Sequence, residues 1–204
     1  MNWNHNNLIK KVAHNKFKEF AKEQMADKGL YRNTYVAFLI GFGFLFAVAV
    51  GYGVSLMFLA QEFTVIIQVT TGVLFCFTIL IILHELLHGL AYKLSGAKNV
   101  YFGAIFSKFL FYAGSDQEEF NGTRYRFVAL FPFVIITGVS LLMLLLYSEY
   151  IPFGLAVLFV HTLFCGGDFA AANFIAKHDL KKIHTYDSRE KGETYFYFKD
   201  ETVS

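Results

Sequence analysis

The chain has 204 residues, of which 55% are hydrophobic, 19% aromatic and only 17% charged. A soluble domain of this length needs more polar surface, so the composition excludes an ordinary soluble protein and is typical of a membrane protein. The net charge of +2, with no basic cluster interleaved with aromatic side chains, gives no support for nucleic-acid binding.

The N-terminal segment, residues 1–33, is polar and basic, and it lacks the apolar core and cleavage site of a signal peptide. Some of its apolar residues are spaced as in a short amphipathic helix lying at the membrane surface. These are Leu8, Val12, Phe17 and Phe20. A solvated lead-in helix explains the same pattern, so both interpretations stay open.

Four segments are apolar and long enough to cross a bilayer, since a spanning helix needs roughly 20 residues. They are residues 34–60, 64–92, 127–147 and 152–176. Links of three and four residues join the first segment to the second and the third to the fourth. The sequence therefore predicts two tight helical hairpins.

The basic residues predict the orientation of these spans. Seven lie before the first span, five between the second and third, and six after the fourth, which accounts for all 18 lysines and arginines. With four crossings, all of them fall on one side of the membrane. Because positive charge favours the cytoplasmic side, both termini are expected to be cytoplasmic, in a multi-pass protein of the cell membrane.

Two connecting or terminal segments have a different character. Residues 99–113 are rich in aromatic and β-branched types and read as a short β-hairpin or an interfacial strand pair. Residues 177–204 form a polar tail with one β-like patch at 195–198. The predicted fold is therefore all-α, with four transmembrane helices, a cytoplasmic segment before residue 34 and a transmembrane domain over residues 34–176.

An HExxH motif lies inside the second predicted span, at His84, Glu85 and His88. Residues four apart share one face of a helix, so both imidazoles can reach a single metal ion. Glu85 is rotated off that line, where it can hold a water and accept its proton. Ionisable groups are costly within a membrane, so a metal site is favoured over a hydrogen-bonded cluster that only joins helices.

Asp168 is the predicted third ligand, because catalytic zinc usually takes three protein ligands. It lies nine residues before Lys177, as His84 lies nine before Lys93, which predicts a similar depth in the membrane. A divalent zinc ion with two neutral histidines and two carboxylates carries no net charge, which reduces the penalty of burying the carboxylates. Gly167, just before Asp168, permits close backbone approach.

His161 is the competitor for this position. In a regular helix it lies roughly 10 Å deeper than Asp168, which fits the other two ligands poorly. Helix packing is the preferred interpretation, although a role behind the ligands or along a substrate path stays open. Cys165 and Cys76 are interpreted as small buried residues, with soft-metal binding a further option for Cys165. Asn173 and Gln68 are expected to serve in packing.

These residues together resemble the bacterial putative zincin peptidase membrane family, which is related to the site-2 proteases. The resemblance rests on HExxH followed by Gly89, on Arg-Tyr-Arg and Ala-Leu-Phe-Pro-Phe within residues 124–133, and on Gly-Asp at 167–168. It covers about residues 30–180. It implies zinc held by two histidines and a distant aspartate, with the motif's glutamate as the base. It also implies substrate presentation by strand addition, a role open to residues 99–113.

The predicted function is an intramembrane zinc metalloprotease that cleaves membrane proteins or peptides near the cytoplasmic leaflet. Its expected metal ligands are His84, His88 and Asp168, its catalytic residue is Glu85, and its cofactor is zinc. Two alternatives stay open. One is a non-catalytic metal-binding membrane protein, either a permease or a scaffold, in which Glu85 is dispensable. The other is a zinc hydrolase that acts on a lipid-linked substrate.

Overall fold

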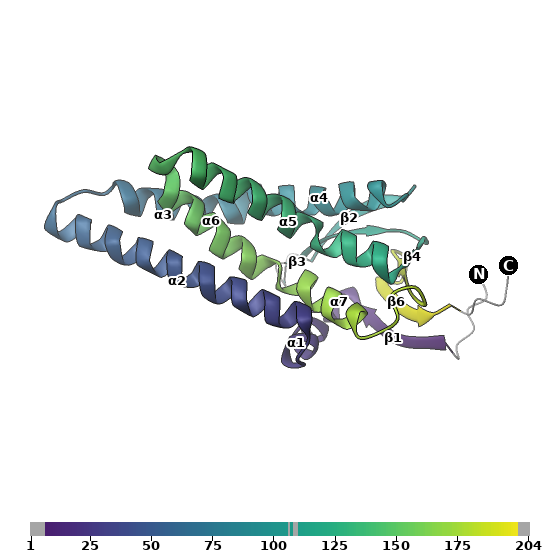
Figure 1. The fold of residues 1–204 in the computed structure, drawn as a ribbon. Helices are drawn as coiled ribbons and strands as arrows, with labels where there is room; N and C mark the ends of the chain where they lie inside the picture. Colours follow the sequence, from purple (N-terminus) through teal and green to yellow (C-terminus); the bar gives the residue numbers. More distant parts are fainter. Residues whose placement is uncertain (1–6, 106, 108–109, 200–204) are drawn as a thin grey trace. The chain divides into compact units, whose positions relative to one another are not determined.

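The computed structural model describes residues 7–105, 107 and 110–199 (Figure 1). Parts of the predicted terminal segments and hairpin, at residues 1–6, 106, 108–109 and 200–204, lie outside this set. Contacts divide the chain into two compact units. Unit 1 comprises Met1–Arg32, Glu85–Pro132 and Gly167–Ser204, and unit 2 comprises Asn33–His84 and Phe133–Gly166.

Helices form most of the chain. They are α1 (Phe17–Ala26), α2 (Leu30–Leu59), α3 (Thr64–Phe75), α4 (Ile81–Leu94), α5 (Gly122–Leu146), α6 (Ile151–Phe164) and α7 (Gly166–Ala176), with short 3-10 turns at His14–Lys16 and Ser148–Tyr150. A π-helical segment, Cys76–Leu80, joins α3 to α4. Such segments often occur close to functional sites, and this one ends shortly before the HExxH motif.

Among the described residues, three helical stretches are long and apolar enough to cross a membrane. They are Leu30–Leu59, Thr64–Leu94 and Gly122–Leu146. The bent pair formed by Ser148–Phe164 and Gly166–Ala176 makes a fourth if it is taken as one span. These boundaries agree with the predicted spans to within a few residues, because a long apolar helix is a strong local signal.

The chain is mostly helical, as predicted, but it is not all-α, because unit 1 also contains two antiparallel sheets. The larger has the strand order β1-β6-β5-β4, and the smaller pairs β2 with β3. The strands are β1 (Leu8–Ala13), β2 (Val100–Ile105), β3 (Leu110–Ser115), β4 (Glu119–Asn121), β5 (Ile183–Ser188) and β6 (Glu193–Phe198). The hairpin predicted within residues 99–113 is confirmed.

The N-terminal residues that suggested one amphipathic helix divide into strand β1 and helix α1. In β1, Val12 pairs with Thr194 and Lys11 with Tyr195 of β6. A strand needs a neighbour for its backbone hydrogen bonds, and this neighbour lies at the other end of the chain. The local sequence therefore could not reveal the strand. The β-like patch predicted at 195–198 falls within β6.

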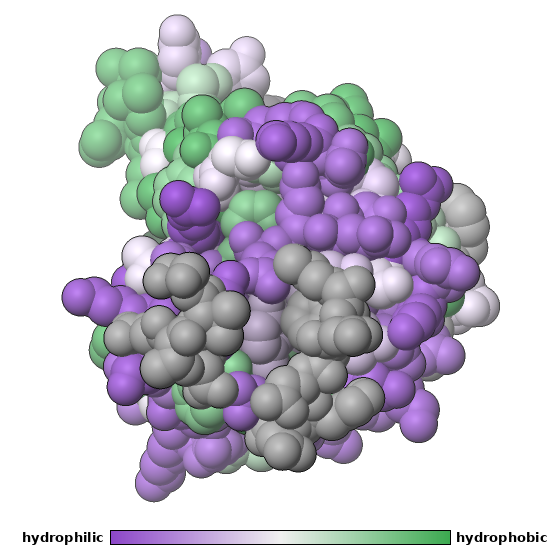
Figure 2. All heavy atoms as spheres, turned by 90° about the vertical axis from the view of Figure 1, so that its right-hand side faces the viewer, coloured by the Kyte–Doolittle hydropathy of each residue, from purple (hydrophilic) through white to green (hydrophobic). Residues whose placement is uncertain are grey.

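In the core of unit 1, the four-stranded sheet packs against α1 and α7. The Phe20, Phe174 and Phe196 rings meet pairwise, with centroids 4.9–6.0 Å apart. Buried Val12 and Ile183 extend this cluster. Figure 2 shows hydrophilic side chains over much of the face that carries β1, β4 and β6.

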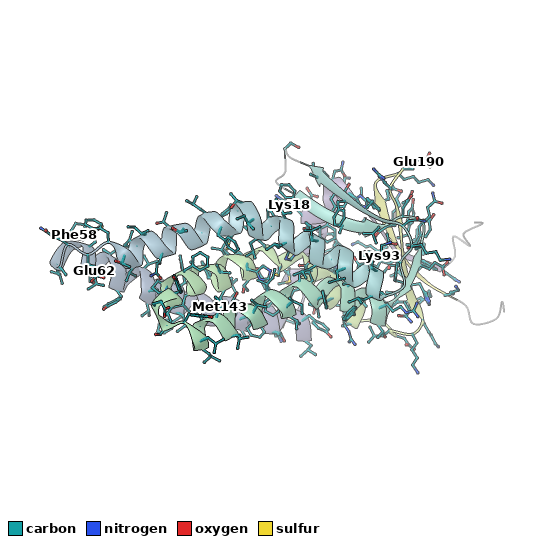
Figure 3. All side chains as sticks on the ribbon, turned by 90° about the horizontal axis from the view of Figure 1, so that it is seen from above. Lys18, Phe58, Glu62, Lys93, Met143 and Glu190 are labelled. Carbon is teal, nitrogen blue, oxygen red and sulfur yellow. The ribbon has the colours of Figure 1, made fainter. Side chains whose placement is uncertain are left out.

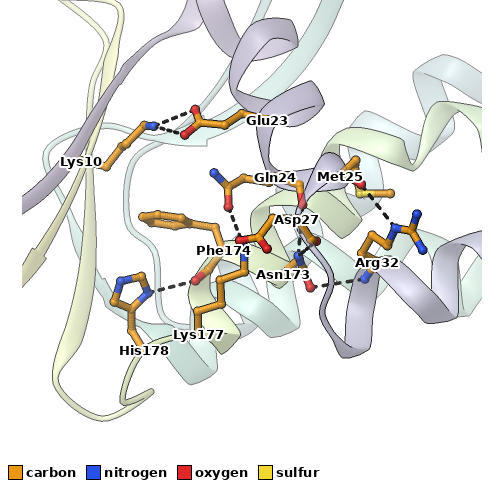
Figure 4. Close-up of polar contacts among 10 residues, drawn as sticks. All are labelled: Lys10, Glu23, Gln24, Met25, Asp27, Arg32, Asn173, Phe174, Lys177 and His178. Carbon is orange, nitrogen blue, oxygen red and sulfur yellow. Dashed lines mark hydrogen bonds and ion pairs between the residues drawn. The ribbon is translucent and has the colours of Figure 1, made fainter.

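Asn173 fixes the turn between α1 and α2, which confirms its expected packing role (Figure 4). Its side chain is buried and donates to the carbonyl oxygens of Gln24 and Asp27, at 3.1 and 3.3 Å, while its Oδ1 accepts from the backbone N–H of Arg32 at 3.3 Å. A Cβ atom at Gly29 would collide with the Asn173 side chain, so this close approach requires glycine.

Unit 2 consists of helices that pack through aromatic rings and close glycine contacts. The rings of Phe46 and Phe159 stack with centroids 4.9 Å apart. A Cβ atom at Gly72 would lie 2.8 Å from the Phe153 carbonyl oxygen, so α3 and α6 approach closely there. Near the C-terminal end of α2, Phe58 is 74% exposed (Figure 3). Outward apolar residues of this kind are typical of a lipid-facing surface.

Candidate metal site

The HExxH motif lies on α4, which runs from one unit into the other. His84 and His88 are four residues apart on this helix, and both side chains are buried. The boundary between the units falls between His84 and Glu85.

In unit 1, His88 is held between a carbonyl oxygen and a carboxylate. Its Nδ1 lies 3.0 Å from the Val128 carbonyl oxygen, and its Nε2 lies 3.3 Å from Asp168 Oδ1. Because a carbonyl oxygen only accepts, Nδ1 carries the hydrogen, and Nε2 is the atom directed at Asp168. Metal-binding histidines usually have one nitrogen fixed in this way.

Asp168 reaches this position because α7 begins two residues before it, at Gly166. A Cβ atom at Gly167 would lie 3.0 Å from the Phe17 ring of α1, so a small residue allows the first turn of α7 to pack closely there. Asp168 is predominantly buried, with 18% of its side chain exposed.

Glu85, His88 and Asp168 line one cavity of about 110 Å³ within unit 1. This volume accommodates several waters or one amino acid side chain. The cavity is lined by further residues from α4, α5 and both sheets, including four tyrosines. A carboxylate, an imidazole and a second carboxylate therefore face a common space that a small polar group can enter.

In unit 2, His84 is held by a different set of groups. Its Nδ1 lies 3.1 Å from His161 Nε2, and the same nitrogen of His161 lies 3.4 Å from Cys165 Sγ. The potential ligand atoms of these three buried residues all lie within 4.8 Å of one another. His161 and Cys165 are fully buried.

The depth argument that separated His161 from His84 is therefore wrong. It assumed a regular helix from His161 to Asp168, but α6 ends at Phe164 and α7 starts at Gly166. The rise of 1.5 Å per residue holds only within an unbroken helix. The interpretation of both cysteines as buried is confirmed.

The family of the chain follows from its similarity to a known protein family. Residues 77–181 match the family described as "putative zincin peptidase". The chain belongs to this family. Comparisons with curated proteins and with solved structures gave no match. The matched region contains the HExxH motif, Asp168, the hairpin β2–β3 and helices α5 to α7.

Membership in the putative zincin peptidase family indicates a metalloprotease and implies zinc. The side chains present fit this ion. Zinc in catalytic sites takes imidazole nitrogens and carboxylate oxygens, which His88 and Asp168 offer 3.3 Å apart. The hydrogen bond from His88 to Val128 supplies the outer support typical of such ligands.

Some residues around the cavity were not found from the sequence. Val128 acts through its backbone, which leaves no sequence signal, and His14, Asp187 and Thr194 come from segments interpreted as polar ends of the chain. One signal was available for Asp187. Asp187 lies on the same face of β5 as Ile183 and Thr185, both buried, so an acidic residue occupies an inward position.

Proposed function

We propose that the protein is an intramembrane zinc metalloprotease that hydrolyses peptide bonds of membrane proteins. The observation that carries this proposal is the arrangement around His88 in unit 1. His88 Nε2 lies 3.3 Å from Asp168 Oδ1, and Glu85 lines the same cavity. A ligand pair and a carboxylate base facing one enclosed space support hydrolytic chemistry.

The proposed zinc ligands are His84, His88 and Asp168. Two of them are supported by the contact in unit 1, and the third by its place one helical turn from His88 on α4. His161 supports the orientation of His84, since a hydrogen bond from His84 Nδ1 to His161 Nε2 leaves His84 Nε2 for zinc. When bound, zinc supplies Lewis acidity that polarises a carbonyl group and lowers the pKa of a coordinated water.

Glu85 is the proposed proton carrier. Its carboxylate takes a proton from the attacking water as the water oxygen forms a bond to the carbonyl carbon of the substrate. It then gives that proton to the amide nitrogen as the C–N bond breaks. The products are a carboxylic acid and an amine, and Glu85 returns to its ionised form. In this proposal, Val128 and His161 hold the imidazoles of His88 and His84 and do not transfer protons.

The proposed location of the reaction is the cytoplasmic side of the membrane. All 18 lysines and arginines belong to unit 1, which also contains the cavity, whereas unit 2 contains none. By the positive-inside preference, this distribution supports a cytoplasmic position for unit 1 and for both termini. A substrate helix entering there must unwind locally, because helical carbonyl groups are hydrogen-bonded and shielded.

The experiment that tests this function compares wild type with Glu85→Gln in detergent. Each protein is incubated with a solubilised membrane fraction from cells that lack it, and new peptide termini are mapped by mass spectrometry. The variant should keep about one zinc per chain and lose cleavage by roughly 10²–10⁴-fold. Glu190→Gln, at the exposed turn between β5 and β6, is the matched control (Figure 3).

Cleavage that persists in zinc-loaded Glu85→Gln would contradict the role of Glu85. No cleavage by zinc-loaded wild type would favour the scaffold alternative. A Glu85-dependent change in membrane lipids without new peptide termini would instead favour the lipid-linked substrate.

A further inference from the structure

The cavity in unit 1 has a second polar region, formed by residues outside the HExxH motif. Asp187 of β5 and Thr194 of β6 line it, together with His14 and Tyr101. The Thr194 hydroxyl lies 2.6 Å from Asp187 Oδ1, and His14 Nε2 lies 3.4 Å from the same hydroxyl oxygen. The two strands pair at this point, with Asp187 opposite Thr194 in the register.

Asp187 has hydrogen-bond donors but no cationic partner among the described residues. Its carboxylate accepts hydrogen bonds from the side chains of Thr194 and Tyr92 and from the backbone at Ser115. None of these groups is charged, so they orient the carboxylate without neutralising it. Burial raises the pKa of Asp187 to about 6, which leaves it ionised at neutral pH. A buried, ionised carboxylate is normally paired with a cation.

His14 does not provide that cation at neutral pH. Burial lowers the pKa of His14, although the nearby Glu193 partly opposes the shift. The lowered pKa favours the neutral imidazole at neutral pH. Its Nδ1 is buried and has no hydrogen-bond partner among the described residues.

The Tyr101 hydroxyl is a second buried polar atom without a partner in the described part of the chain. The residue is only 8% exposed and lines the cavity. Buried polar groups are nearly always hydrogen-bonded, so two such atoms around one cavity indicate where a polar ligand group binds.

The hairpin β2–β3 supplies an aromatic wall to the same cavity. Tyr101 lies across from Gly114 and Tyr112 across from Gly103 in the strand register. A Cβ atom at Gly114 would lie 2.7 Å from the Tyr101 ring, and one at Gly103 would also collide with the Tyr112 ring. Each glycine thus lets the opposite ring lie over the strand. The Arg189 guanidinium already lies over the Tyr101 ring, 5.4 Å from its centroid, so Tyr101 offers a ligand its unpartnered hydroxyl.

We propose that Asp187, with Thr194 and the tyrosines around it, forms a subsite that binds a primary ammonium group of a peptide substrate. The assignment of the ligand to a substrate rests on the proposed protease function. The ammonium group has three donors and one positive charge, which suit a carboxylate, a neutral imidazole and a phenol oxygen. It can come from a lysine side chain or from the amino terminus of a peptide. Membrane proteins carry lysines close to the cytoplasmic ends of their spans.

The test measures binding to the full-length, zinc-loaded Glu85→Gln protein in detergent. This background prevents cleavage and removes another carboxylate that lines the cavity. The probes are Ac-Ala-Lys-Ala-NH₂, Ac-Ala-Nle-Ala-NH₂ and unblocked Ala-Nle-Ala-NH₂, titrated by calorimetry. The second has no ammonium group, and the third has one only at its amino terminus.

At least one ammonium peptide should bind about tenfold or more tightly than the neutral peptide, as expected for a charge-assisted hydrogen bond. Adding Asp187→Asn should remove this difference, whereas the exposed Asp179→Asn should retain it. A preference for the first peptide identifies lysine as the source of the ammonium group, and a preference for the third identifies the amino terminus.

Equal affinity of the three peptides for the zinc-loaded Glu85→Gln protein would overturn the proposal, whatever the affinities of the variant that also carries Asp187→Asn. A preference that survives Asp187→Asn, with the thermal transition unchanged, would also overturn it. The readout is independent of hydrolysis. If the ammonium peptides bind more tightly but wild type cleaves no substrate, the protease function is refuted and the subsite stands. If wild type cleaves substrates but the peptides bind equally well, the subsite is refuted and the protease function stands.

Discussion

The two units differ in charge and in how each holds one histidine of the HExxH motif. Unit 1 contains all 18 basic residues and both sheets, whereas unit 2 contains no lysine or arginine and two acidic residues, Glu62 and Glu149. In unit 1, His88 is held by the Val128 carbonyl oxygen and Asp168. In unit 2, His84 contacts another imidazole, and a thiol lies next to that imidazole.

His84 and His88 of one short motif are therefore held by different kinds of group. Oxygen acceptors from unit 1 fix the tautomer of His88 and offer a carboxylate that can share a metal ion. Within unit 2, His161 lies 3.1 Å from His84 Nδ1 and supports the ring through a neutral group. Substitutions in unit 1 and in unit 2 should therefore affect zinc binding to different extents.

The largest effect is expected from removing the proposed carboxylate ligand in unit 1. Asp168→Ala should abolish zinc binding and lower cleavage at least 10³-fold, because a ligand and its charge are both lost. Zinc per chain, measured by mass spectrometry, checks this. The exposed Asp179→Ala should retain about one zinc. Full zinc occupancy in Asp168→Ala would remove Asp168 from the site.

The core that seals the sheet of unit 1 provides the next prediction. Phe196 is fully buried between Phe20 and Phe174, so Phe196→Ala should destabilise the protein by about 3–5 kcal/mol. Phe198 of the same strand is 38% exposed, and Phe198→Ala should cost less. Thermal unfolding in detergent compares the two. Equal losses would mean that the sheet does not stabilise unit 1 through this core.

A smaller effect is expected from the ionisation of Asp187. Because the pKa is raised from 3.8 to about 6, the stability that this group contributes is fully present below pH 3.8 and is lost as pH rises through 6. The loss is about 3 kcal/mol at most. Asp187→Asn should therefore flatten the decline in thermal stability between pH 4 and pH 7. A variant that declines as steeply as wild type would contradict this.

The smallest effect is expected in unit 2. His161→Ala should weaken zinc binding about 10–100-fold by releasing His84 from its fixed orientation. Cys165→Ala removes a buried thiol that lies 3.4 Å from His161 Nε2, and it should change zinc affinity by less than about threefold. Competition with a chelator measures both. Unchanged affinity in folded His161→Ala would mean that His161 serves only in packing.

The sequence by itself determined the features that depend on local periodicity. The apolar segments that became α2, α3–α4 and α5, the four-residue spacing of His84 and His88, and the one-sided distribution of basic residues all follow from short stretches of chain. These patterns repeat within a few residues, so no knowledge of distant partners is needed.

Only the tertiary structure decided the partners that lie far apart in the chain. The pairing of β1 with β6, the contact of His84 with His161 and the entry of Asp187 into the cavity join residues separated by many positions. Strand pairing needs a neighbour that the strand's own sequence does not specify, and the break between α6 and α7 invalidates depths counted along a regular helix. The HExxH motif could therefore be predicted from the sequence, but the residues that hold its two histidines could not.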